Sequence, residues 1–299
     1  MNQRRLAAVA AVLVVALAGP ARAEAADDAA TINDTGVSVD EFEQFVAALP
    51  EAGFSDFATD ELSSTVGAEP GRAALTLLVT NEAHRQFFAG LGLAAPTEDE
   101  RDAAMASTAA EDPVRQVPVV YDAVADNAAY RARLDALPVP ETEILREQYE
   151  TSPTSLGVYC ATAVLVAERD DADAIIETYE SEDTTVEAVA ASVGATVADW
   201  QCAPLTSVTD PALRESLLAA EPGEAIGPVA TSEGFAVVVI DSFDEAAPKL
   251  ENFFLRLEES GQTPGPVLFQ GFLGTSDITV APRYGRWDPT TGSVIALGT

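Results

Sequence analysis

The sequence contains very few basic residues. Lys249 is its single lysine, and 16 lysines and arginines stand against 49 acidic residues, which gives a formal net charge of −33. A surface this acidic repels phosphate backbones and argues against nucleic-acid binding. We interpret the acidity as a solvated surface that keeps the protein soluble. Attraction of basic polypeptides or cations is the alternative.

The shortage of histidine and cysteine limits the possible chemistry. His84 is the only histidine and lies far along the chain from Cys160 and Cys202, which argues against a zinc site and against a Cys–His nucleophile. The chain also has no Gly-x-Ser-x-Gly elbow and no phosphate loop. Carboxylates are so numerous that chance pairs are expected, so none of them indicates a glycosidase. We therefore expect no metal and no cofactor.

Only the N-terminus carries a targeting segment. Arg4 and Arg5 precede an apolar run from Leu6 to Ala18, and Ala21-Arg22-Ala23 has the small residues of a cleavage site. We expect residues 1–23 to be a signal peptide, so that the protein is exported and meets a membrane only through this segment before cleavage. An uncleaved signal anchor is the alternative. No cysteine lies near the cleavage site, which argues against a lipid anchor.

Cys160 and Cys202 are the only cysteines of this chain. In an exported protein such a pair favours a disulfide. A bridge that closes a loop of this length would stabilise the fold by about 4 kcal/mol.

Residues 221–241 predict a turn, a short strand, a second turn and a buried strand. Pro222-Gly223 and Gly227-Pro228 mark the two turns. The β-branched run from Val237 to Ile240 is typical of a strand that is covered on both faces.

The pattern G-E-x-x-G-P-V-x-T-x-x-G-F, from Gly223 to Phe235, resembles the end of a parvulin-type peptidyl-prolyl isomerase domain. Val158 to Ala167 resembles the first strand of that family, and Ala198 to Cys202 resembles its Asp-Leu-Gly turn. The resemblance implies a four-stranded antiparallel sheet with surrounding helices over residues 152–245. It also implies that Cys160 and Cys202 lie on neighbouring strands.

The two histidines of the parvulin active site fall at Ala163 and Ala236 in this chain. The resemblance therefore implies that no catalytic residue is left, and we expect negligible isomerase activity. Five positions match or neighbour the family's proline pocket and are candidates for client contact: Trp200, Leu213, Leu217, Thr231 and Phe235.

The rest of the chain predicts a helical module that is discontinuous in sequence. Ser38 followed by Glu41 is a capping box that begins a helix, and amphipathic segments then continue through residues 30–151. The segment V-A-P-R-Y-G-R-W from Val280 resembles the ending of exported SurA-like proteins. It implies that residues 246–299 return to the helical module and pair with the strand near Ile32. Within this segment, apolar residues at helical spacing predict a helix from Pro248 to Glu259.

Together these features indicate an α+β fold, with a helical module like the SurA N-terminal domain and a parvulin-like domain. The resemblance to SurA/PrsA-like foldases implies an exported chaperone that binds unfolded or extended polypeptides, with a degenerate isomerase domain. An active isomerase with an atypical site and a cell-envelope adaptor that holds one specific partner are the alternatives.

Overall fold

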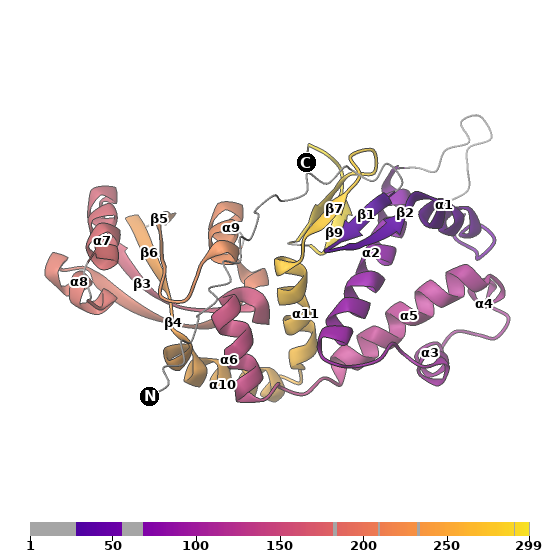
Figure 1. The fold of residues 1–299 in the computed structure, drawn as a ribbon, viewed down its shortest axis with the longest axis horizontal. Coiled ribbons are helices and arrows are strands. Elements are labelled where there is room, and N and C mark those ends of the chain that lie inside the picture. Colours follow the sequence, from indigo (N-terminus) through magenta and orange to yellow (C-terminus); the bar gives the residue numbers. More distant parts are fainter. Residues whose placement is uncertain are drawn as a thin grey trace, which may run out of the picture.

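The computed structural model describes residues 28–55, 68–181, 184–208, 210–231, 234–289 and 291–298. The predicted signal peptide, residues 1–23, lies outside these residues. Figure 1 shows two lobes, one built of helices around a small sheet and one built on a larger sheet. All paired strands are antiparallel, so the predicted α+β class is confirmed. Within the described ranges, no helix has the length and apolar character needed to cross a membrane.

The helical lobe begins with a hairpin and continues through helices that carry their own start signals. The Ser38 hydroxyl accepts a hydrogen bond from the backbone N–H of Glu41, and Thr97 forms a full capping box with Glu100. The elements are β1 (Asp28–Ile32), β2 (Thr35–Ser38), α1 (Val39–Ala48), α2 (Ala68–Gly90), α3 (Glu98–Ala104), α4 (Pro113–Gln116), α5 (Pro118–Asp135) and α6 (Thr142–Thr151).

The C-terminal segment returns to this lobe, as the resemblance implied. Strand β7 (Ile278–Val280) pairs with β1, and Ile278 lies opposite Ile32. A second hairpin follows, made of β8 (Arg286–Asp288) and β9 (Ser293–Ile295). The backbone N–H of Val294 donates to the Thr76 hydroxyl on α2, which ties this hairpin to the helices. The predicted pairing near Ile32 is therefore confirmed, while the exact domain boundaries stay predictions.

The second lobe is built on a four-stranded antiparallel sheet with the order β4-β3-β6-β5. Helices α7 and α8 cover one face, where they pack on Val164, Val237 and Val239. Helix α9 covers the other face, where Leu217 packs on Val238. The elements are β3 (Val158–Val166), α7 (Arg169–Ser181), α8 (Val186–Val193), β4 (Thr196–Pro204), α9 (Pro211–Ala219), β5 (Ala225–Thr231) and β6 (Gly234–Ile240).

The predicted turn at Ala198–Cys202 is wrong, because these residues lie inside β4. Strand β4 pairs with β3 from Val158–Pro204 to Leu165–Thr196. The ladder satisfies the backbone groups of the whole segment, and this outweighs its local similarity to a turn.

Helix α10 (Phe243–Glu259) begins before Pro248, where the sequence predicted its start. The missed signal is a capping box, because Ser242 and Glu245 satisfy each other's backbone N–H groups. Pro248 therefore lies inside the helix. Helix α11 (Pro264–Thr275) follows, and its Phe269 packs into the helical lobe.

His84 lies in the core of the helical lobe and is 2% exposed. Its ring stacks on Phe269 at 4.1 Å and on Tyr130 at 5.4 Å between ring centroids. Burial, together with the smaller effect of the Arg131 charge, lowers the pKa of His84 from 6.5 to about 4. The imidazole is therefore a neutral packing group at pH 7.

We expect this histidine to make the fold sensitive to acid. Between pH 6.5 and about pH 4 the unfolded chain binds a proton at His84 that the folded chain does not, so stability falls as the pH falls through this window. The loss amounts to about 3 kcal/mol. Urea unfolding at pH 7 and pH 4 should show a loss that is larger by this amount in the wild type than in His84→Phe. Equal losses in both proteins would contradict the assignment.

Candidate functional site

Ala163 and Ala236 lie together on one face of the larger sheet. Strands β3 and β6 pair so that Ala163 lies opposite Val238 and Leu165 lies opposite Ala236. Residues that are opposite each other share a face, as do residues two apart on a strand. The two alanines are therefore diagonal neighbours on the face that α9 covers.

The alanine pair brings no reactive group to this face. Ala163 is 0% exposed and Ala236 is 1% exposed, and neither methyl group can donate or accept a hydrogen bond. Leu165, the partner of Ala236, is partly exposed beside them. The arrangement supplies apolar surface and backbone, and these two positions provide no acid, base or nucleophile.

Three of the five candidate contact residues lie on or near this face. Leu217 is buried against Val238, and Leu213 packs at the margin of the same cluster. Helix α9 holds both leucines, and Asp210 caps this helix by accepting from the backbone N–H of Leu213 at 2.8 Å. Thr231 is exposed at the end of β5.

The structure does not bring Phe235 to this site. Side chains alternate along a strand, so Phe235 faces away from Ala236. It packs instead with Val237 and Val239 on the face that α7 and α8 cover. The backbone of Trp200 pairs with Ala161, while its side chain lies outside the described part of the structure.

Cys160 and Cys202 form a disulfide between β3 and β4, with a Cα–Cα distance of 4.2 Å. The sulfurs come from neighbouring strands, as the resemblance implied. Both cysteines are buried in the main core, at 0% and 4% exposure. The bond is therefore a structural cross-link away from solvent.

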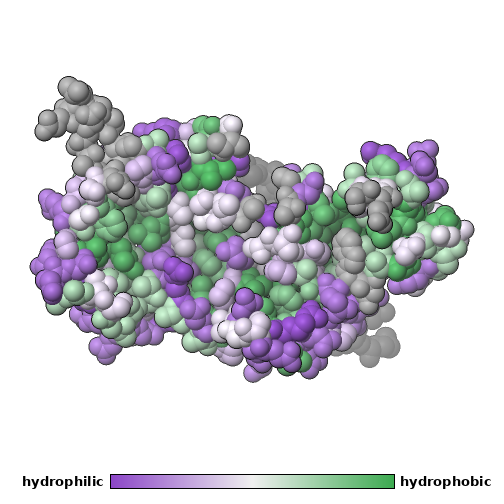
Figure 2. All heavy atoms as spheres, turned by 180° about the vertical axis from the view of Figure 1, so that it is seen from behind, coloured by the Kyte–Doolittle hydropathy of each residue, from purple (hydrophilic) through white to green (hydrophobic). Residues whose placement is uncertain are grey.

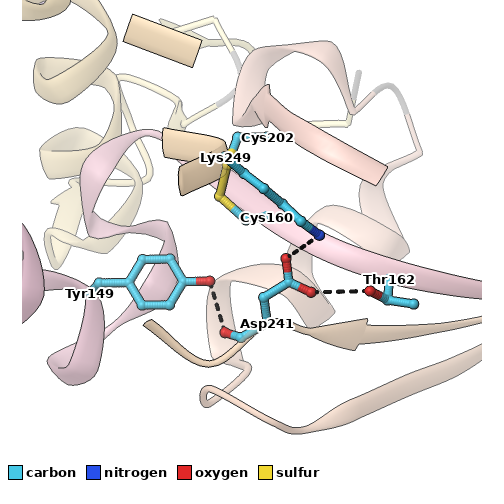
Figure 3. Close-up of a disulfide and its surroundings, with 6 residues drawn as sticks. All are labelled: Tyr149, Cys160, Thr162, Cys202, Asp241 and Lys249. Carbon is cyan, nitrogen blue, oxygen red and sulfur yellow. Dashed lines mark hydrogen bonds and ion pairs between the residues drawn. A yellow bond between two sulfur atoms is a disulfide. The ribbon is translucent and has the colours of Figure 1, made fainter. Parts of the chain in front are cut away.

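A buried ion pair lies beside the disulfide and was missed from the sequence (Figure 3). The Lys249 ammonium group on α10 donates to Oδ2 of Asp241 at 2.8 Å, and the Thr162 hydroxyl on β3 donates to Oδ1 at 3.2 Å. The Tyr149 hydroxyl on α6 donates to the backbone carbonyl of Asp241 at 2.9 Å. The available signal was Lys249 itself, the only lysine in a strongly acidic chain.

This network joins the sheet of one lobe to helices α6 and α10. Burial raises the pKa of Asp241, and the hydrogen bond and charge of Lys249 oppose that effect. Around it, Arg146 pairs with Asp244 at 3.0 Å and lies over the Phe243 ring at 4.3 Å. We interpret the network as a structural seam between the lobes.

The chain is similar in structure to several solved proteins at low sequence identity. No family model and no curated protein match it. PrsA from Bacillus subtilis is 14% identical, with 70% of this chain and 85% of that chain covered and a TM-score of 0.25. A structure of the SurA-like chaperones PEB4 and Cj1289 of Campylobacter jejuni is 13% identical, with coverage of 85% and 99% and a TM-score of 0.28.

A third similar structure is the peptidylprolyl isomerase PrsA of Bacillus anthracis, 11% identical, with coverage of 67% and 95% and a TM-score of 0.21. These structural neighbours are PrsA and SurA-like chaperones. At these TM-scores the whole chains superpose loosely.

Proposed function

We propose that this protein is an exported chaperone-like protein that binds unfolded or extended polypeptides and lacks prolyl isomerase activity. The observation that carries the proposal is the pair of buried alanines, Ala163 and Ala236, at the centre of a sheet that resembles the parvulin sheet. On this proposal the chain keeps the shape of a parvulin-like domain but lacks the polar side chains of its active site.

The absence of isomerase activity follows from the barrier of the reaction. Rotation about an X–Pro bond must overcome about 20 kcal/mol, and lowering it requires groups that favour the twisted amide. In the parvulin family the paired histidines belong to that polar network. Alanine at both positions leaves no titratable or hydrogen-bonding side chain to replace them.

Exposed apolar side chains on both lobes support binding of unfolded polypeptides. Large hydrophobic residues in solvent are typical of surfaces that contact other chains when they gather in patches. Figure 2 shows apolar residues gathered over parts of both lobes and bordered by hydrophilic ones. Large apolar side chains that are exposed in the described part of the chain include Leu93, Ile144, Leu165, Val193 and Leu255.

A test of chaperone function measures light scattering of a chemically unfolded client that is diluted into buffer. We expect the full chain without residues 1–23 to suppress aggregation at a few-fold molar excess. Unchanged aggregation of several clients at high excess would contradict the proposal. Recovery of a single stoichiometric partner from the cell envelope, with no effect on unfolded clients, would favour the adaptor alternative.

A protease-coupled assay on a proline peptide measures isomerase activity. We expect the rate with the protein to equal the uncatalysed rate, because both histidine positions are alanine. Catalysis that is lost in Thr231→Ala or Leu213→Ala would place an atypical active site on the α9 face and refute this part of the proposal.

A further inference from the structure

A groove of about 330 Å³ lies in the helical lobe, between β2, α1, α2 and α5. It is separate from the alanine pair, because every residue that lines it lies between Gly36 and Tyr130. Its floor is apolar, and the apolar side chains that line it are Val37, Phe45, Leu78, Val119 and Ala123. Strand β2, which contributes Gly36 and Val37 to the lining, is an edge strand of its sheet.

The rim of this groove is acidic. Four carboxylates line it, those of Glu41, Glu82, Asp122 and Asp126, whereas Arg85 is the only basic residue in the lining. Arg85 is already paired with Glu82. A single further arginine, Arg101, reaches both aspartates, with its nitrogens 3.6 Å from Asp122 and 3.2 Å from Asp126. The rim therefore keeps a net negative charge.

The charge at the rim is incompletely compensated. Burial raises the pKa of Asp126, the charge of Arg101 lowers it, and the neighbouring Asp122 raises it again. A bound cation would relieve this repulsion. Among the described residues, no three His, Cys, Asp or Glu side chains are close enough to hold a metal ion. The groove therefore fits an organic cation with an apolar stem better than a metal.

Tyr130 supplies a second polar feature at the floor of the groove. It lines the groove while only 3% exposed, and its ring stacks on His84 and Phe88 at 5.4 Å between centroids. No hydrogen bond of its hydroxyl is found in the described part of the chain. Burial raises the pKa of this hydroxyl, the charges of Asp126 and Glu82 raise it further, and those of Arg133 and Arg85 oppose the effect.

We propose that this groove binds a segment of a client polypeptide in which arginine or lysine alternates with apolar residues. The apolar stem of the basic residue would lie on the floor, and its cationic head would contact the rim carboxylates and the Tyr130 oxygen. This inference rests on the proposed chaperone function and specifies its client class. The opposite charges of groove and client segment also favour fast encounter.

The test compares two labelled peptides by fluorescence anisotropy with the full chain. In one peptide arginine alternates with leucine, and in the other glutamate replaces arginine. We expect the arginine peptide to bind and the glutamate peptide to bind at least tenfold more weakly. The double variant Glu41→Gln/Asp122→Asn should weaken binding of the arginine peptide about tenfold, because it removes two of the carboxylates that would pair with the cationic heads.

A matched control separates the groove from the overall charge. Glu43→Gln/Asp135→Asn makes the same change in charge on α1 and α5 at exposed positions outside the groove lining. It should keep the affinity within about twofold. Tyr130→Phe removes only the hydroxyl and keeps the ring stacking. It should weaken binding severalfold, because the cationic head of the peptide loses the Tyr130 oxygen as a hydrogen-bond acceptor. Thermal unfolding curves show whether each variant is folded.

The outcomes also separate this inference from the proposed function. Equal losses of affinity in the groove variant and the control variant would show that binding depends only on net charge, and they would overturn the inference. Full affinity in the groove variant would overturn it as well. If the protein still suppresses client aggregation in either case, the chaperone function stands and only the groove assignment fails. If aggregation is not suppressed and neither peptide binds, both fail.

Discussion

Replacing Lys249 with methionine lowers the free energy of unfolding by about 3–5 kcal/mol, because it leaves the buried Asp241 carboxylate without its cation. The carboxylate is 4% exposed and the lysine side chain 14% exposed, so water cannot replace the lost partner. The Thr162 hydroxyl remains as a hydrogen-bond donor, which is too weak to compensate a buried charge. Urea unfolding at pH 7 measures the loss.

Two control variants distinguish the loss of a buried ion pair from the loss of an exposed one. Arg169→Met removes an exposed ion pair with Asp173, 3.7 Å long, and should change stability by less than about 0.5 kcal/mol. The double variant Asp241→Asn/Lys249→Met removes both charges and should recover part of the loss. If Lys249→Met lowers the free energy of unfolding as little as Arg169→Met does, the buried ion pair does not stabilise the seam between the lobes.

Reduction of the Cys160–Cys202 disulfide lowers the free energy of unfolding by about 4 kcal/mol. The bond spans 42 residues, and without it the unfolded chain gains the entropy of an open loop. Urea unfolding with and without a thiol reductant measures the difference. Both cysteines are buried, so reduction of the folded protein should be slow.

The variant Cys160→Ala/Cys202→Ala is the companion to chemical reduction. It should be destabilised by a similar amount and should no longer respond to the reductant. A reductant effect that persists in this variant would show that the disulfide is not its source. A wild-type protein of unchanged stability after complete reduction would contradict the expected contribution of loop closure.

Much of the fold could be predicted because its signals are local. Ser38 and Glu41 mark the start of α1, and the predicted turn at Pro222-Gly223 precedes β5. The second predicted turn, Gly227-Pro228, is wrong, because both residues lie inside β5, where the pairing with β6 is irregular between Ile226 and Val229. The start of α10 was missed because Pro248 outweighed the capping box at Ser242. Local signals for the start of a helix can conflict, and the packing of the folded chain determines which of them applies.

The candidate site was predictable in part. The motif ending at Phe235 implied which positions replace the histidines, and the strand register then brings Ala163 and Ala236 to one face. The same alternation moves Phe235 to the other face. A pattern of residue types identifies candidates for a pocket, whereas the pairing of strands decides which of them share it.

The sequence by itself determined the charge, the alanines at positions 163 and 236 and the single possible cysteine pair, because these depend only on which residues are present. Tertiary structure alone decided the partner of Lys249 and the groove that β2, α1, α2 and α5 enclose. Elements far apart in the chain meet there. Their contacts depend on how the helices and sheets pack, which no local period or propensity encodes.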